Sequence, residues 1–211
     1  MLKVPRLEEL NMHSSSRWFS KKVTRKIRLS TAGLLTAACL FAWAPANAQS
    51  GILAPATVVK PHAYVSLSPV PRGKEFEIAV VANIVSGYHV NSHKPTDPYL
   101  IPTTITADLP KGFQLVDTIY PPGEEKRFPF SPDKPLNVYS GSVTLRLKLT
   151  AKNEAALGAA TIPLTLRYQA CNDSACLPPV RLPVSLKLQV ANANAKARPV
   201  HPEIFGADSP R

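Results

Sequence analysis

The chain has 211 residues, with 25 Lys and Arg against 14 Asp and Glu, a formal net charge of +11 and 22 prolines. Much of the excess charge lies in the first 48 residues, which hold eight basic and two acidic residues and leave a net of +5 for the rest. No basic stripe is interleaved with aromatic residues, which argues against a nucleic-acid partner.

Residues 1–48 have the organisation of a secretory signal peptide. A basic region of five Lys and Arg spans positions 21–28, and the apolar run Leu29–Trp43 follows it. This run is shorter than the roughly 20 residues that a membrane-spanning helix needs. Ala46-Asn47-Ala48 then matches a small-x-small cleavage site, so we predict a mature start at Gln49 and export from the cytoplasm.

Three alternatives stay open for this segment. Because the basic region is long, translation could start at Met12, and the apolar run could remain as an uncleaved membrane anchor. Cys39 could be a lipid-attachment cysteine, although Thr36-Ala37-Ala38 before it matches that signal poorly. We expect Cys39 to be removed with the signal.

The mature chain alternates apolar and polar residues with a period of two, which predicts strands and not helices. The strongest stretches are Phe76–Ile84, Val143–Thr150, Thr161–Ala170 and Val180–Val190. Weaker candidates are Ala63–Leu67, Pro102–Leu109 and Phe113–Tyr120. Strands with one apolar face pack best as two antiparallel sheets, so we predict one all-β sandwich domain over residues 49–190. Pro163 and Pro183 indicate edge strands, bulges or strand starts.

Two long connections interrupt the predicted strands, Asn91–Leu100 and Pro121–Asn137. The second contains four prolines and two phenylalanines, Phe128 and Phe130. Long loops in compact domains are usually functional or disordered. Residues 191–211 lack a pattern, and we predict a flexible C-terminal tail.

Two cysteines remain after signal removal, Cys171 and Cys176, in the sequence Tyr168-Gln169-Ala170-Cys171-Asn172-Asp173-Ser174-Ala175-Cys176-Leu177-Pro178-Pro179. They lie where one predicted strand ends and the next begins, and the polar residues between them favour a turn. Disulfides persist in exported proteins. The pair is therefore a structural bond, a redox-active bond or part of a metal site.

The residues around the pair do not decide between these readings. A disulfide across so short a loop stabilises a fold by only about 2 kcal/mol, and this small gain argues weakly against a purely structural role. A redox role requires one accessible sulfur, because exchange proceeds through a mixed disulfide. The stretch bearing Phe128 and Phe130 could act as a lid over the pair, or those rings could simply pack in the core.

His89 and His93 flank Asn91, and in a strand the three side chains would share one face. With a thiolate, the two histidines could bind copper or zinc. Two histidines at this spacing are more often surface or hydrogen-bonded groups. No nucleophile–His–acid arrangement and no glycine-rich phosphate loop stands out.

The motif Tyr168-Gln169-Ala170-Cys171 through Cys176-Leu177-Pro178-Pro179 resembles the active-site region of the N-terminal domain of the thiol–disulfide interchange protein DsbD. The segments Gly87-Tyr88-His89-Val90-Asn91 and Val138-Tyr139-Ser140-Gly141 fit the same family upstream, and the likeness covers about Val58–Val190.

The resemblance implies an immunoglobulin-like sandwich with Cys171 and Cys176 as the redox pair, shielded by an aromatic cap loop. It implies a periplasmic protein-disulfide reductase that needs no metal or organic cofactor. In this family the domain takes electrons from a thioredoxin-like domain, which a membrane domain feeds. It passes them to periplasmic isomerases and to thioredoxins of cytochrome c maturation. The chain would then work as a stand-alone domain with thioredoxin-fold donors and acceptors, and the membrane electron carrier would be a separate protein.

The chain departs from the family pattern at several positions. Four residues separate the cysteines, where some members have five, and His89 and Asn91 stand where some members place tyrosines. The cap candidates Phe128 and Phe130 lie in a longer, proline-rich stretch. The near-site candidates are thus His89, Asn91 and Tyr168, and either cysteine could be the attacked sulfur. Two alternatives remain: a protein-binding sandwich with a structural disulfide, and a periplasmic metal carrier.

Overall fold

A computed structural model describes residues 53–206, so the predicted signal peptide, its cleavage site and Cys39 lie outside the described residues. None of the helices in the described part is long and apolar enough to cross a membrane. The chain opens with a short 3-10 helix, η1 (Pro55–Thr57), and continues almost entirely in strands.

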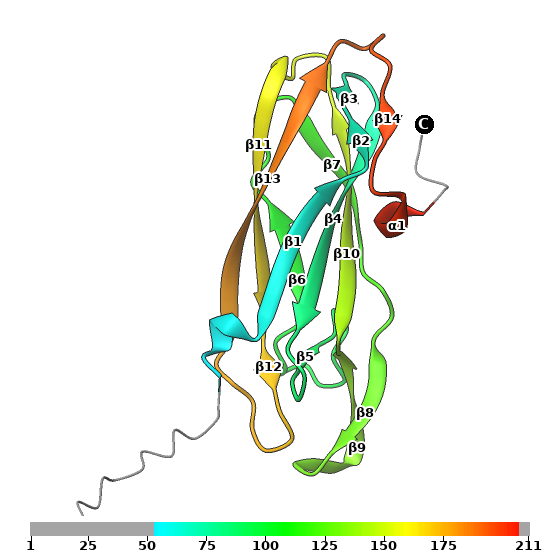
Figure 1. Cartoon of the computed structure of the whole chain (residues 1–211). Helices are drawn as coiled ribbons and strands as arrows, with labels where there is room; N and C mark the ends of the chain where they lie inside the picture. The colour runs from blue at the N-terminus through cyan, green and yellow to red at the C-terminus, as the bar shows by residue number, and fades with distance from the viewer. Residues whose placement is uncertain (1–52, 207–211) are drawn as a thin grey trace, which may run out of the picture. The chain divides into compact units, whose positions relative to one another are not determined.

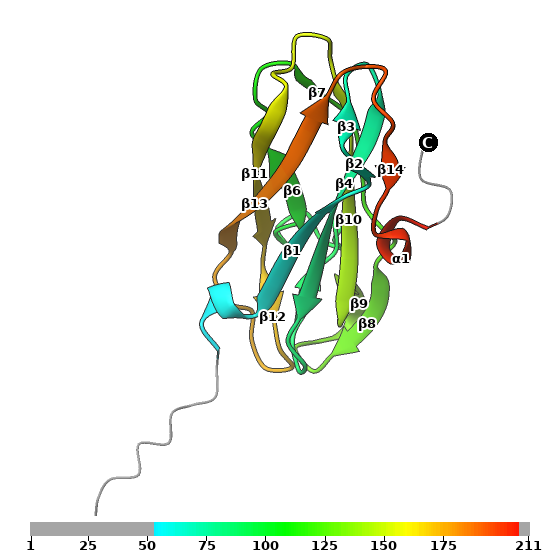
Figure 2. The same cartoon turned by 45° about the horizontal axis from the view of Figure 1, so that its top comes forward.

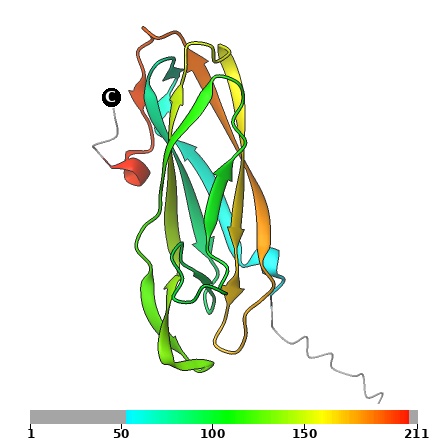
Figure 3. The same ribbon diagram turned by 180° about the vertical axis from the view of Figure 1, so that it is seen from behind.

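Two four-stranded sheets face each other and enclose the core (Figure 1). One sheet has the order β1 (Val59–Val65), β4 (Glu75–Ile84), β10 (Ser142–Ala151) and β7 (Phe113–Ile119), with antiparallel neighbours throughout. The other has the order β3 (Val70–Pro71), β13 (Val180–Ala191), β11 (Gly158–Tyr168) and β6 (Thr104–Ala107). The view from behind shows β6 and β11 on the face opposite β1 (Figure 3). This arrangement confirms the predicted all-β, immunoglobulin-like sandwich.

The core is made by the alternating apolar residues of the long strands. The most deeply buried of these side chains are at most 2 % exposed and include Phe76, Ile78, Val80, Leu145, Leu147, Leu149, Ile162, Leu164 and Leu166. Burial of a side chain of this size stabilises the fold by about 1.5–3 kcal/mol. The periodicity of the sequence therefore predicted both the strands and the face that each strand buries.

Pro163 and Pro183, the two prolines for which edge strands, bulges or strand starts were predicted, occupy different environments. Pro183 lies on a stretch of β13 that pairs only with β11, which is the predicted edge position. Pro163 lies in β11, a strand with a neighbour on each side, so the prediction of an edge strand is wrong there. The ladder between β11 and β6 spans only Leu164–Arg167, and Pro163 stands at its end. The Pro163 carbonyl accepts from the Asp108 amide at 2.9 Å, but the proline has no N–H with which to return the second bond of an antiparallel pair.

A third, smaller sheet closes one end of the sandwich. Its order is β12 (Ala170–Cys171), β5 (His89–Asn91), β9 (Ser131–Tyr139) and β8 (Glu124–Phe128). Strands β8 and β9 form a hairpin that lies at the same end as the loop after β12 (Figure 1). Much of the predicted loop over Pro121–Asn137 is therefore regular structure, because its residues form most of the β8–β9 hairpin, while Val138 and Tyr139 just after it pair with β5.

The C-terminal residues fold back onto the sandwich. Strand β14 (Arg198–Pro199) pairs with β2 (Leu67–Ser68), and the short helix α1 (Pro202–Phe205) lies beside β10 (Figures 1 and 2). Phe205 is 5 % exposed, and the Arg146 guanidinium lies 6.0 Å from its ring centroid and donates to the Ile204 carbonyl. Up to Gly206, this packing differs from the predicted flexible tail.

Candidate functional site

Cys171 and Cys176 form a disulfide at the end of the sandwich that carries the third sheet. The two residues pair directly as an antiparallel bridge, with their Cα atoms 3.9 Å apart. The loop between them is a tight turn in which the Asn172 Oδ1 atom accepts hydrogen bonds from the backbone amides of Ser174 and Ala175, both at 2.9 Å. The polar residues between the cysteines thus make the turn that the sequence predicted.

The two sulfur-bearing residues differ sharply in exposure. Cys171, in β12, has no solvent-accessible surface, whereas Cys176 is exposed. A thiolate from another protein attacks a disulfide in line at one sulfur, so access decides which sulfur reacts. In this arrangement Cys176 is the outer and Cys171 the inner residue of the bond.

His89 lies directly beside the inner cysteine. In the antiparallel pair of β12 and β5, Cys171 is opposite His89 and Ala170 is opposite Val90. Val90 and Ala170 pack into the main core. Because side chains alternate along a strand, His89 and Cys171 leave the other face of this ladder together, with Cβ atoms about 4.5–5.5 Å apart.

The tip of the β8–β9 hairpin covers this face. The Phe128 ring stacks on the His89 imidazole with centroids 3.9 Å apart and planes inclined by 18°, and Phe128 is only 7 % exposed. Phe130 stacks on the outside of Phe128 at 5.4 Å and is 41 % exposed. Of the two candidate lid residues, Phe128 is thus the one in contact with the histidine beside Cys171, and Phe130 forms the outer layer.

A pocket of about 410 Å³ opens beside His89 and joins the hairpin to the cysteine loop. Its lining includes Lys126 and Phe128 from β8 and Asp173 from the loop between the cysteines. Burial lowers the pKa of His89 to about 4, with Lys126 adding to the decrease and Asp173 opposing it. The imidazole, which is 4 % exposed, is therefore neutral at physiological pH.

Hydrogen bonds of Asn91 and Gln169 link β5 to the residues that flank the cysteine loop. The Asn91 side chain, which is fully buried, donates from Nδ2 to the Ile101 carbonyl at 3.1 Å and to the Gln169 Oε1 atom at 3.2 Å. Gln169 donates from Nε2 to the carbonyl of Leu177, the residue after Cys176, at 3.3 Å. The pair thus connects β5 to both sides of the cysteine loop. Sequence reasoning missed Gln169 as a candidate, although it stands in the motif two residues before Cys171.

Tyr168 has a packing role in the structure. Its ring is fully buried in the main core, and its hydroxyl donates to the Pro55 carbonyl in η1 at 2.7 Å. Burial raises the pKa of this hydroxyl. Tyr168 therefore anchors the N-terminal turn against the end of β11.

His93 lies in a separate environment from His89. Its ring stacks on Tyr120 at 3.6 Å with parallel planes, and its Nδ1 atom is 3.3 Å from the Thr103 carbonyl oxygen. Within residues 53–206, no three His, Cys, Asp or Glu side chains gather as a metal site would require. The two histidines stack on different aromatic partners, so their contacts do not form the shared ligand set that the metal hypothesis needs.

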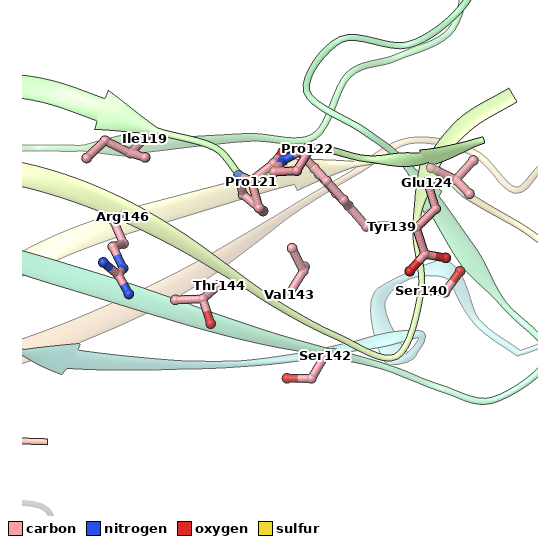
Figure 4. A pocket seen from close by; sticks show the side chains of 11 residues that line it. Ile119, Pro121, Pro122, Glu124, Tyr139, Ser140, Ser142, Val143, Thr144 and Arg146 are labelled. Atoms are coloured by element: carbon pink, nitrogen blue, oxygen red, sulfur yellow. Dashed lines mark hydrogen bonds between the residues drawn. The ribbon is translucent and has the colours of Figure 1, made fainter. Parts of the chain in front are cut away.

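A second pocket, of about 380 Å³, lies along β10 beside the segment that leads into β8 (Figure 4). Glu124, Tyr139 and Arg146 contribute polar groups to its wall, and no cysteine or histidine lines it. The Tyr139 hydroxyl donates to the Pro121 carbonyl at 2.8 Å.

Comparisons with known proteins bear on this site. The family model described as thiol:disulfide interchange protein DsbD, N-terminal, matches residues 55–188. No curated protein matches the chain. Among solved structures, the N-terminal domain of Neisseria meningitidis DsbD in the reduced form matches with 20 % identity and a TM-score of 0.40, covering 70 % of this chain and 94 % of that one. The N-terminal periplasmic domain of Proteus mirabilis ScsB matches with 15 % identity and a TM-score of 0.40, covering 64 % of this chain and 48 % of that one.

Proposed function

Because the chain belongs to the family of the N-terminal domain of the thiol:disulfide interchange protein DsbD, we propose that it is an exported thiol–disulfide relay. In this role it passes electrons from a reduced thioredoxin-like donor to oxidised periplasmic proteins, with Cys171 and Cys176 as the redox pair. Family membership supports thiol–disulfide exchange in general. The direction of transfer and the partners are part of the proposal.

The observation that carries the proposal is the unequal exposure of the two cysteines. Cys176 is open to a partner, while Cys171 is fully buried beside a histidine under Phe128. A relay needs one sulfur that partners reach and one that is protected from other thiols. A bond that only braced a turn would need neither the exposed sulfur nor the aromatic cover.

The exchange follows from this geometry. A thiolate of the reduced donor attacks Sγ of Cys176, a mixed disulfide forms, and the bond to Cys171 breaks, leaving Cys171 as a thiolate that takes up a proton. The donor's second thiolate then attacks the donor sulfur of the mixed disulfide and releases Cys176. The donor leaves oxidised and the relay reduced by two electrons, and the same steps in reverse reduce an acceptor.

The remaining parts of the proposal concern location and partners. We place the working domain after a cleaved signal of residues 1–48, in the periplasm, with thioredoxin-fold proteins on both sides of the electron transfer. Acceptors of the cytochrome c maturation type and a separate membrane electron carrier as the source fit this scheme. The chemistry needs no metal or organic cofactor, because the two sulfurs carry the electrons.

The reduction potential of the pair tests this function. We expect equilibration in glutathione or dithiothreitol buffers to place it between about −120 and −270 mV, the range of exchange proteins. Mass spectrometry after alkylation gives the reduced fraction at each buffer ratio. A potential below about −300 mV would instead identify a structural bond and favour the alternative of a protein-binding sandwich.

A further inference from the structure

Two buried polar side-chain atoms of the site have no hydrogen-bond partner among residues 53–206, Nε2 of His89 and Oδ1 of Asn91, and of these two residues His89 is the one opposite a cysteine. The Nε2 atom of His89 makes no hydrogen bond within the described part of the chain, although the residue is 4 % exposed. Buried polar atoms nearly always have a partner, so an atom without one calls for an explanation. We propose that Nε2 of His89 accepts the proton of the Cys171 thiol, first as a hydrogen bond in the reduced protein and then fully when Cys171 attacks. This inference rests on the proposed exchange at the cysteine pair.

The pairing of β12 with β5 places a hydrogen-bond donor, the thiol of reduced Cys171, opposite His89. His89 and Cys171 are directly opposite each other and leave the same face of the ladder, so the thiol of Cys171 is the neighbouring side-chain group across the strands. In the disulfide form the sulfur of Cys171 carries no hydrogen and cannot donate. The missing partner of Nε2 is thus a group that exists only after reduction.

The hairpin excludes competing partners from the imidazole. Phe128 covers a face of the ring at 3.9 Å, and Phe130 covers Phe128 in turn. A neutral imidazole has one unprotonated nitrogen that can accept a hydrogen bond. Because water is largely kept away from His89, the thiol of Cys171 has little competition for that nitrogen.

The charges around His89 keep it in the accepting form. Lys126 from β8 and Asp173 from the cysteine loop are the charged groups that line the adjoining pocket, and Lys126 donates to the Ser140 hydroxyl at 2.9 Å. The His89 pKa of about 4 reflects burial first, with Asp173 and Lys126 acting in opposite directions. When the Cys171 thiolate forms, its negative charge favours a proton on His89, so the base strengthens as the reaction needs it.

The step that uses this base is the resolution of the mixed disulfide. When a partner is bonded to Cys176, the Cys171 thiol gives its proton to Nε2 of His89, and its sulfur attacks Sγ of Cys176. The disulfide between Cys171 and Cys176 forms, and the bond to the partner breaks. The partner leaves as a thiolate and regains a proton from solvent as His89 returns to neutral.

The small disulfide DTNB tests this step without a partner protein. Mixed with the reduced protein, it releases one thionitrobenzoate when Cys176 attacks it and a second when Cys171 resolves the product. We expect His89→Phe, which keeps a ring for the stack on Phe128, to slow the second release at least tenfold at neutral pH. The deficit is expected to shrink as the pH rises, because a growing fraction of the thiol then ionises without a base.

A matched control is His93→Phe, which also replaces a stacked histidine but lies outside the contacts of the disulfide. We expect this variant to release the second thionitrobenzoate at the wild-type rate. A slowing by His89→Phe that is equal at every pH, or no slowing, overturns the proposal for His89 and leaves the relay intact. If instead the wild-type pair fails to react with DTNB, the proposed function itself fails.

A measurement on the wild-type protein keeps the proposal testable if His89→Phe does not fold. We expect the nitrogen chemical shift of His89 Nε2 to move on reduction of the disulfide, because the atom gains a hydrogen bond, while the shifts of His93 stay in place. An Nε2 shift that is the same in the oxidised and reduced proteins contradicts the proposal.

Discussion

A Cys171→Ser variant is expected to form a stable mixed disulfide with a thioredoxin-fold protein, whereas Cys176→Ser is expected to form almost none. The physical reason is exposure, because Cys176 is open to solvent and Cys171 has no accessible surface. A partner sulfur that bonds to Cys176 cannot be displaced when Cys171 is absent. The lone Cys171 of the other variant is buried beside His89, whose ring is covered by Phe128, and a partner sulfur cannot approach a buried sulfur in line.

The measurement uses a thioredoxin that lacks its resolving cysteine and carries thionitrobenzoate, as a mixed disulfide, on the remaining one. The thiolate of the variant attacks the thioredoxin sulfur and releases thionitrobenzoate as the new mixed disulfide forms. A non-reducing gel and mass spectrometry of the linked peptide then identify the adduct. A double variant without either cysteine is the control for adducts formed elsewhere. Equal trapping by the two single variants would contradict the assignment of Cys176 as the attacked sulfur. An absence of adducts from both would contradict the relay.

Phe128→Ala is expected to expose the inner cysteine. In a Cys176→Ser background Cys171 is the only thiol of residues 49–211, so its alkylation by iodoacetamide reports directly on the cover. Truncating a buried phenylalanine typically lowers the free energy of unfolding by about 3–5 kcal/mol. A decrease of about 1.4 kcal/mol in the free energy of local opening is enough to raise the open population tenfold. We therefore expect Cys171 to be alkylated at least ten times faster in the Phe128→Ala protein.

Phe130→Ala is the matched control for this prediction. Phe130 stacks only on the outside of Phe128 and is 41 % exposed, so its removal leaves the ring over His89 in place. We expect less than about a threefold change in the alkylation of Cys171. If Phe128→Ala and Phe130→Ala have the same small effect, the β8–β9 hairpin does not shield the site.

The sandwich could be predicted from the sequence because its strands are long and each buries one face. The alternation in Phe76–Ile84 and Val143–Thr150 appears in the structure as β4 and β10, which pair along nearly their whole length. The apolar–polar alternation within a strand does not specify which other strands lie beside it in the sheet. The position of β11 between β13 and β6, which disagrees with the edge suggested by Pro163, depends on which distant strand pairs beside it.

The C-terminal residues show the same limit. Residues 198–206 have no periodicity, because their order comes from tertiary contacts and not from an amphipathic pattern. Ladder bonds from β14 to β2 and the contacts of Arg146 with Ile204 and Phe205 hold this segment. None of these partners is near in sequence, so no pattern within residues 198–206 predicts the contacts.

The candidate site was partly visible in the sequence. The polar residues between the cysteines predicted the turn, and the two phenylalanines of the proline-rich stretch suggested a lid. The contact of Phe128 with His89 required the β8–β9 hairpin to be placed against β5, and the pairing of β9 with β5 joins residues far apart in the sequence. The same holds for Gln169, whose role depends on reaching Asn91 and Leu177 in space.

The most direct test of the account is exchange between the folded protein and thioredoxin, started from both sides. One mixture contains the oxidised protein and reduced thioredoxin, and the other contains the reverse pair, with acid quenching and maleimide labelling of free thiols over time. The account predicts that both mixtures reach the same ratio of oxidised to reduced Cys171–Cys176 within about a minute, faster than the minutes to hours of uncatalysed disulfide rearrangement. A bond that stays intact for hours in the presence of excess reduced thioredoxin, while the domain remains folded, would contradict it.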